Sequence, residues 1–179
     1  MASGDERALL ERVANGDRAA MRALYDIHAD GVHRFVSSWL ADPFDASDIV
    51  QETMLEVWRR AGSFAGRSAV KSWIFSIARN KAVDRNRKGG RAILTDSPPD
   101  QIDEAPDPHA ALEAVQNAER IRACMDKLSA PHRAAIHLAF FEDLSYAEIA
   151  EIEQCAVGTI KTRVHHAKAA LMRCLARSG

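Results

Sequence analysis

Residues 144–171 read LSYAEIAEIEQCAVGTIKTRVHHAKAAL, and this stretch decides what the C-terminal part of the chain is expected to be. Ser145 followed three residues later by Glu148 forms a capping box, which predicts a short helix over 146–152. After a four-residue turn, apolar residues recur at the spacing of one buried helix face: Ile160, Val164, Ala167 and Leu171. Two helices joined by so short a turn predict a helix-turn-helix.

The second helix of this pair, expected over 157–176, turns small, hydrogen-bonding and basic side chains to solvent. From 157 to 177 the chain has five basic residues and no acidic one. Such a helix fits a DNA major groove, where basic groups neutralise phosphates and polar groups reach base edges. We therefore expect DNA contacts, rather than an ordinary solvated face, from the following residues: Thr159, Lys161, Thr162, Arg163, His165, His166 and Lys168.

A second basic helix is expected upstream, with Ser68 as its cap and Lys88 near its end. Its core side is the stripe Val70, Trp73, Ile74 and Ile77, and Ser72, Ser76, Arg79, Asn86 and Arg87 are expected on or near the opposite side. The helix macrodipole accounts for one or two cations at a helix C-terminus. The segment 79–88 has five, interspersed with Asn, which favours contact with phosphates and base edges.

The segment 45–60 predicts a third informative helix, capped by Asp45. Its buried side is the stripe Val50, Met54, Val57 and Trp58, while an apolar residue, Leu55, stands among polar groups on the other face. Isolated exposed leucines are common. Beside acidic residues and a glutamine, however, this one fits the centre of a protein-docking patch, with these neighbours: Asp48, Gln51 and Glu52.

The remaining helices are expected over 5–14, 18–40, 109–128 and 130–142, and no strand is expected. Between residues 91 and 108, four prolines lie among five acidic residues with few apolar ones, a composition typical of a flexible linker. The expected fold class is therefore all-α: two small helical domains, 1–90 and 113–179, joined by an acidic, proline-rich linker over 91–112.

The overall composition excludes several classes of protein. The chain has 179 residues and a net charge of −1, an average that hides the two basic segments on either side of the acidic one. No run of about 18 apolar residues exists, which excludes membrane insertion. The three cysteines are too few and too scattered for a disulfide framework, as expected in a reducing cytoplasm. Metal-ligand spacings and catalytic motifs are lacking, so no catalytic residue, metal or cofactor is expected.

Three stretches, taken together, resemble the extracytoplasmic-function (group 4) sigma factors of bacterial RNA polymerase. They are DASDIVQETMLEVW (45–58), SWIFSIARNKAVDRNRK (72–88) and the stretch 144–171, and the resemblance extends over about residues 5–176. It implies a non-enzymatic subunit that binds core RNA polymerase and directs promoter-specific initiation. The first domain would bind polymerase and help melt the −10 element of promoter DNA, and the second would read the −35 element.

The resemblance also implies roles for individual residues. Asp48, Gln51 and Glu52 would contact core polymerase, on the face that carries Leu55. The −35 element would be addressed by Lys161, Thr162, Arg163 and His165. An anti-sigma factor is implied as a further partner. The −10 DNA would lie at or near the 61–68 loop and these residues: Lys71, Asn80, Asp84, Arg85, Arg87 and Lys88.

Three residues of the turn depart from the family's pattern. Gln154 stands where glycine is frequent, Glu153 where an apolar residue is usual, and Ala156 where a capping serine is common. Two other classes of protein fit the sequence less well. A helix-turn-helix regulator with a sensing or dimerising domain would not need the basic helix over 71–88. A purely protein-binding adaptor would not need the helix expected over 157–176, which is basic and has no acidic residue.

Overall fold

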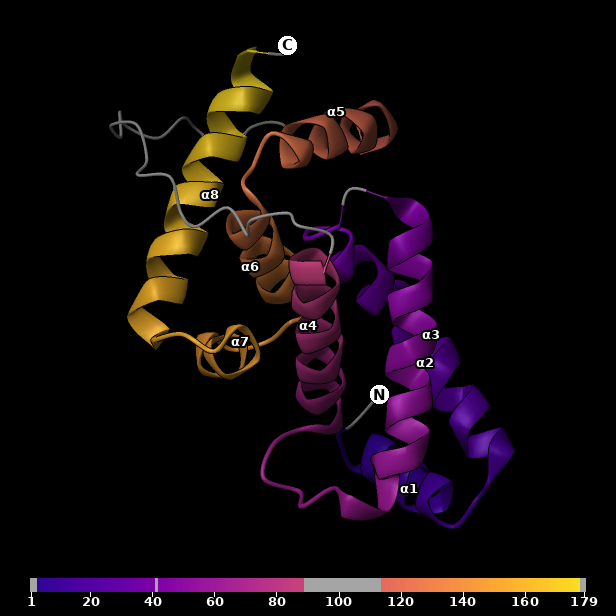
Figure 1. Ribbon diagram of the computed structural model, residues 1–179. Helices are drawn as coiled ribbons and strands as arrows, with labels where there is room; N and C mark the ends of the chain where they lie inside the picture. Colours follow the sequence, from indigo (N-terminus) through magenta and orange to yellow (C-terminus); the bar gives the residue numbers. More distant parts are fainter. Residues whose placement is uncertain (1–2, 41, 89–113, 178–179) are drawn as a thin grey trace.

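The computed structural model describes residues 3–40, 42–88 and 114–177, and within these residues it is entirely helical. α4 stands between the other N-terminal helices and the C-terminal helices α6 to α8 (Figure 1). The expected linker over 91–112 lies outside the described residues. The N-terminal unit comprises α1 (Ser3–Ala14), α2 (Arg18–Val36), α3 (Pro43–Arg60), the 3-10 turn η1 (Ala61–Ser63) and α4 (Val70–Lys88); the C-terminal unit comprises α5 (Ala114–Asp126), α6 (Ala130–Phe140), α7 (Tyr146–Glu153) and α8 (Val157–Arg177).

The predicted helix starts are partly wrong. α3 is capped by Asp42, whose side chain accepts a hydrogen bond from the Phe44 N–H, and not by Asp45. The reason is Pro43: its fixed backbone angle suits the first helical position, so the helix begins before Asp45. α4 begins at Val70, two residues after the predicted cap Ser68.

The core of the N-terminal unit comes from apolar stripes on α2, α3 and α4. Phe35 and Phe75 are fully buried and meet edge to face with their ring centroids 5.4 Å apart, a preferred aromatic geometry. On α4 the predicted stripe is confirmed for Val70, Ile74 and Ile77, which are buried. This packing fixes which faces of α3 and α4 remain for other contacts.

The C-terminal unit contains the predicted helix-turn-helix. The capping box at the start of α7 is confirmed: the Ser145 hydroxyl accepts from the Glu148 N–H, and the Glu148 carboxylate accepts from the Ser145 N–H. On α8, Ile160, Val164 and Ala167 are buried as predicted. The capped α7 and the apolar stripe of α8 therefore hold the outer face of α8 in a defined orientation.

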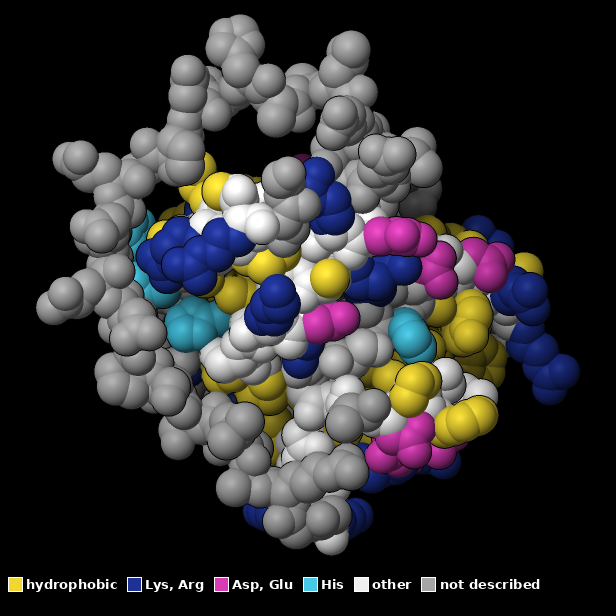
Figure 2. Space-filling view, turned by 90° about the horizontal axis from the view of Figure 1, so that it is seen from above, with side chains coloured by type: hydrophobic (Ala, Val, Ile, Leu, Met, Phe, Trp, Pro, Cys, Tyr) yellow, Lys and Arg dark blue, Asp and Glu magenta, His cyan; other side chains and the backbone are white. Residues whose placement is uncertain are grey.

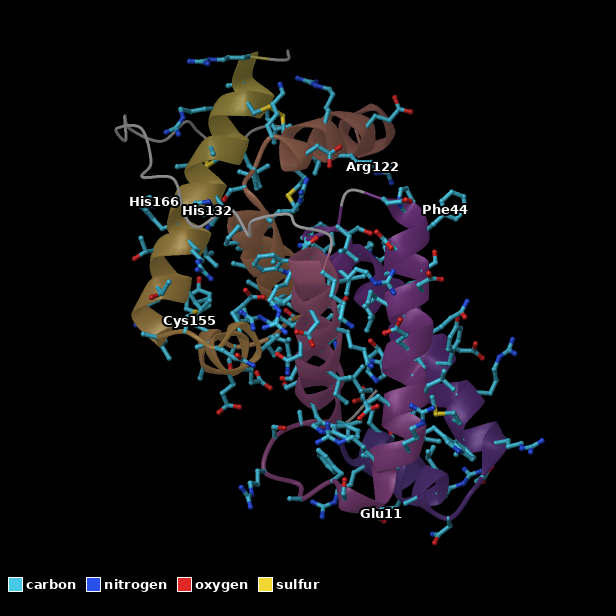
Figure 3. The ribbon with its side chains drawn as sticks, viewed as in Figure 1. Glu11, Phe44, Arg122, His132, Cys155 and His166 are labelled. Carbon is cyan, nitrogen blue, oxygen red and sulfur yellow. A yellow bond between two sulfur atoms is a disulfide. The ribbon has the colours of Figure 1, made fainter. Side chains whose placement is uncertain are left out.

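The cysteine prediction needs correction. Cys124 of α5 and Cys174 of α8 form a disulfide, visible as a yellow bond in Figure 3. They are 50 residues apart in the sequence, but packing of α5 on α8 brings their Cα atoms to 5.8 Å. The cysteines are thus not too scattered to pair, and the bridge fastens α5 to α8.

Candidate functional site

The outer face of α8 carries most of the residues expected to meet DNA. Lys161, Thr162, His165 and Lys168 are exposed, whereas Thr159 and His166 are half-buried. The His166 ring lies between His165 and His132 of α6, with centroid distances of 5.7 and 6.4 Å (Figure 3). Side chains with hydrogen-bonding and positive groups therefore form a continuous row along the exposed side of the helix.

Arg163 departs from this arrangement. Its side chain is half-buried, and Nη1 lies 3.8 Å from Glu153 Oε2 and 3.8 Å from Cys155 Sγ. Cys155 lies in the turn between α7 and α8, as labelled in Figure 3. Arg163 therefore braces the turn from within instead of lying on the outer face with its predicted neighbours.

Two residues at the turn between α7 and α8, Gln154 and Glu153, depart from the family's sequence pattern, and both have unusual surroundings. Gln154 adopts a left-handed backbone conformation with φ of 54°, which explains why glycine suits this position. Glu153 is buried, with 3% of its surface exposed. Burial raises the pKa of its carboxyl to about 7, against the opposing positive charges of Arg79 and Arg163.

The charge distribution agrees with a polyanion-binding C-terminal unit. Seen from above in Figure 2, Lys, Arg and His side chains gather on the left side, where α8 lies, while Asp and Glu side chains lie from the centre to the right, together with further Lys and Arg side chains. The Lys168 ammonium stands 5.5 Å from the ring centroid of Phe140, an exposed aromatic residue at the end of α6. This cation–π contact holds the ammonium at the flank of the helix.

The exposed face of α3 contains an apolar groove. Leu55 is 54% exposed, as predicted for the centre of a docking patch. The second wall of the groove comes from α2 and was not predicted, because no local pattern in a sequence indicates which side chains of two helices face each other across a groove. The lining residues are Arg18, Met21, Tyr25, Gln51, Met54, Leu55 and Trp58.

Acidic residues of α3 and basic residues of α4 form one ionic cluster rather than two separate surfaces. Arg85 donates hydrogen bonds to Asp45 and Glu52, and Asp48 lies 3.8 Å from its guanidinium. Lys81 adds a longer contact to Glu52 at 3.9 Å. The structure thereby joins Arg85, which the resemblance assigned to DNA, to Asp48 and Glu52, which it assigned to polymerase.

The remaining α4 residues fall into two groups. Asp84, Arg87 and Lys88 are exposed at the C-terminal end, with Arg87 paired to Asp84 at 3.3 Å. Lys71 and Asn80 instead contact the C-terminal unit.

The prediction that Ser72 and Asn86 lie on an open face is wrong, because both are buried: Ser72 donates to Glu148, and Asn86 donates to the Trp39 carbonyl.

In the described part of the chain, no three His, Cys, Asp or Glu side chains are grouped as metal ligands would be. Among the helices that the structure describes, none has the length and apolar character needed to cross a membrane.

Comparison with known proteins identifies the class of protein to which this helical fold belongs. The family model for Sigma-70 region 2 matches residues 24–92, and the model for Sigma-70 region 4 matches residues 118–171. The chain is thus a sigma-70-type protein. At 33% identity it is similar to the ECF RNA polymerase sigma factor SigK of Mycolicibacterium vanbaalenii, with 94% of this chain and 88% of the relative aligned. It is equally similar, at 33%, to SigL of Mycobacterium tuberculosis, over 96% and 98% of the two chains.

This chain belongs to the extracytoplasmic-function (ECF) sigma factors, and its general function is promoter-specific transcription initiation. The fold is similar to that of the sigma factor RpoE of Bartonella quintana, solved with the anti-sigma factor NepR: the TM-score is 0.65 at 29% identity, over 87% of this chain and 96% of that one. It is also similar in fold to CnrH, solved with the cytosolic domain of CnrY, with a TM-score of 0.68 at 22% identity, over 97% and 99% of the chains.

Proposed function

We propose that this sigma factor reads the −35 element with α8, docks on core RNA polymerase through α3, and engages and helps melt the −10 element through α4. The division of labour follows domains 1–90 and 113–179, joined by 91–112. The chain acts by binding alone, without catalysis or a cofactor. The observation that carries the proposal is the exposed row Lys161, Thr162, His165 and Lys168 on the second helix of a helix-turn-helix.

The chemistry of this row supports recognition of a major groove. Thr162 and His165 are short enough to meet base edges when α8 lies in the groove, and both offer hydrogen-bonding groups. Lys161 and Lys168 extend from the flanks, where they would neutralise phosphates. Arg163 acts indirectly: its contact with Glu153 orients the turn that aims the helix.

The groove between α2 and α3 supports docking on polymerase. An exposed leucine at the edge of an apolar groove can fill a pocket on a partner, while surrounding carboxylates select a partner of positive charge. Asp48 and Glu52 provide those carboxylates, and Gln51 lies on the groove wall. Arg85 and Lys81 then keep these acidic side chains in place, so we assign Arg85 a positioning role as well as proximity to DNA.

The −10 contacts are assigned to α4. Arg87 and Lys88 are exposed at its end and are available to phosphates. Lys71, Asn80 and Asp84 lie on the same helix and supply the polar groups that a separated strand requires.

We further infer an anti-sigma factor as a regulatory partner, by analogy with the RpoE–NepR complex. Polymerase and chromosomal DNA as partners imply that the chain acts in the cytoplasm.

Run-off transcription tests the proposal directly. The purified chain is added to core RNA polymerase with a library of genomic promoter fragments, and start sites are mapped. The expected result is specific initiation that requires both the chain and core polymerase. Tight binding of the chain alone to duplex promoters, without specific initiation when polymerase is added, would instead identify a helix-turn-helix regulator.

A further inference from the structure

A cationic side chain of α1 lies on the loop that the resemblance assigns to −10 DNA. This loop, residues 61–68, contains η1, leads into α4, and packs against α1 at one end of the molecule (Figure 1). Gly62 of the loop faces Ala14 of α1, and Gly66 faces Arg7. Arg7 and Ala14 are seven residues apart, about two helical turns, so one side of α1 supports the whole loop.

The guanidinium of Arg7 turns its flat side toward the loop. A Cβ at Gly66 would lie 3.2 Å from Arg7 Nη1 and 3.4 Å from both Cζ and Nη2. Because three atoms of one plane are almost equally distant, the guanidinium covers the loop backbone with its face and not with an N–H edge. Gly66 has a φ of 66°, a left-handed conformation that suits glycine, and its lack of a side chain leaves room for this contact.

The N–H groups at the outer edge of this guanidinium are available to a ligand. Nε donates to Glu11 Oε1 at 3.4 Å, and the two side chains are 62% and 70% exposed. A long ion pair between exposed groups contributes little free energy. Within the described residues, Nη1 and Nη2 of Arg7 make no hydrogen bond. Two adjacent N–H groups of an arginine match two oxygens of one phosphate.

The surroundings of the loop favour a single-stranded polyanion. From 57 to 83 the chain has six basic residues and no acidic one, and Arg67, within the loop, is exposed. The half-buried rings of Phe64 and Trp73 meet beside the loop with their centroids 5.1 Å apart. Separated strands of nucleic acid bind where basic groups and aromatic rings are combined. Arg7 adds a further cation to this surface from a helix that is distant in the sequence.

We propose that Arg7 of α1 is a phosphate ligand of the −10 site, so that the backbone of the separated strand held at the 61–68 loop passes over α1. The edge formed by Nη1 and Nη2 binds one phosphate while the flat side of the guanidinium stays on Gly66. This inference rests on the proposed function of the N-terminal domain in engaging −10 DNA. It adds a contact from α1, a helix to which no other feature of the chain gives a role in DNA binding.

Three substitutions in the full-length chain test this role. Arg7→Gln removes the charge, whereas Arg7→Lys keeps the charge and loses the paired N–H edge. Arg12→Gln is the matched control, because Arg12 is also exposed on α1 but pairs with Asp17 at the start of α2. Both arginines are exposed, so no variant should unfold, and circular dichroism checks that helicity is unchanged.

The probe is a forked fragment of a promoter that run-off transcription has mapped. It is double-stranded upstream and single-stranded across the −10 element, and in each of a series of fragments one phosphate of the single strand is replaced by an uncharged methylphosphonate. Fluorescence anisotropy measures the affinity of reconstituted holoenzyme for each fragment.

One methylphosphonate should lower the affinity of the wild-type holoenzyme about tenfold, as expected for loss of a charged hydrogen-bonded contact. Arg7→Gln should bind the unmodified fragment about tenfold more weakly and should be insensitive to that same methylphosphonate. Arg7→Lys should fall between the two, and Arg12→Gln should match the wild type.

Two negative results are distinguishable. If Arg7→Gln keeps the same sensitive phosphate as the wild type, the role of Arg7 is overturned while the −10 function stands. If no methylphosphonate in the −10 strand changes the affinity of the wild type, the proposed −10 function fails together with this inference.

Discussion

The carboxylate of Glu153 is buried beside the guanidinium of Arg163, with 3.8 Å between Oε2 and Nη1. This pair links the end of α7 to α8 across the turn between them. Burial makes the carboxyl costly to ionise and raises its pKa to about 7 from an ordinary 4.5, although the positive charges of Arg79 and Arg163 act in the opposite direction. The turn therefore combines a role in orienting α8 with a dependence on pH.

Stability should fall as the pH rises from 4.5 to 7. In this window the unfolded chain loses the Glu153 proton while the folded chain keeps it, so the free energy of unfolding decreases with pH. The total loss is about 3 kcal/mol, from about 1.4 kcal/mol per pKa unit. Glu153→Gln should therefore match the wild type near pH 4.5 and exceed it above pH 7, as measured by urea unfolding. A stability difference that does not vary with pH would contradict the assigned pKa.

The disulfide between Cys124 and Cys174 should stabilise the C-terminal unit. A bridge across 50 residues restricts the unfolded chain, and its loss is expected to cost about 2–4 kcal/mol. Denaturant unfolding of Cys124→Ser/Cys174→Ser should match the wild type in dithiothreitol. Cys155→Ser, which keeps the bridge, should still respond to dithiothreitol. Equal wild-type stability with and without reductant would argue against the bridge.

Leu55→Asp should abolish binding to core polymerase without unfolding the chain. Leu55 is 54% exposed, so the substitution should change stability by only about 0.5 kcal/mol. Glu52→Lys is a less clean test, since it would place a cation beside Arg85 and Lys81. A pull-down with core polymerase is the measurement, and Ala8→Asp, exposed on α1, is the control. Wild-type capture of Leu55→Asp would remove the groove from the docking surface.

Local patterns in the sequence predicted much of this structure. The capping box of Ser145 and Glu148 and the buried stripe of Ile160, Val164 and Ala167 depend on residues three or four apart, where side-chain spacing on a helix decides burial. The exposure of Leu55 followed from the same periodicity.

Contacts between distant residues were beyond such patterns. Ser72 is buried because Glu148, 76 residues later, covers it. Arg163 turns inward toward the buried carboxyl of Glu153. The spacing of residues within α8 cannot predict this orientation, because Glu153 belongs to another helix. Asp42 caps α3 in preference to Asp45 because Pro43 fixes the first turn of the helix.

Lys168 should contribute affinity without specificity. It lies on the flank of α8, 5.5 Å from the Phe140 ring centroid, where its ammonium would meet a phosphate. Lys168→Ala should weaken holoenzyme binding to all promoters about equally and lower the slope of log affinity against log salt by about one. Titrations at several salt concentrations measure this slope. A promoter-dependent loss would instead assign Lys168 to base recognition.

The central claim is that the exposed row on α8 selects the promoter. The most direct measurement is binding of reconstituted holoenzyme to a DNA library randomised in the upstream element, followed by sequencing, for the wild type and for Thr162→Ala and His165→Ala. Both residues are exposed at the middle of the row. Each variant is predicted to change the preferred bases and to lose about 1–3 kcal/mol on the wild-type sequence. Unchanged base preference in both variants would contradict the claim.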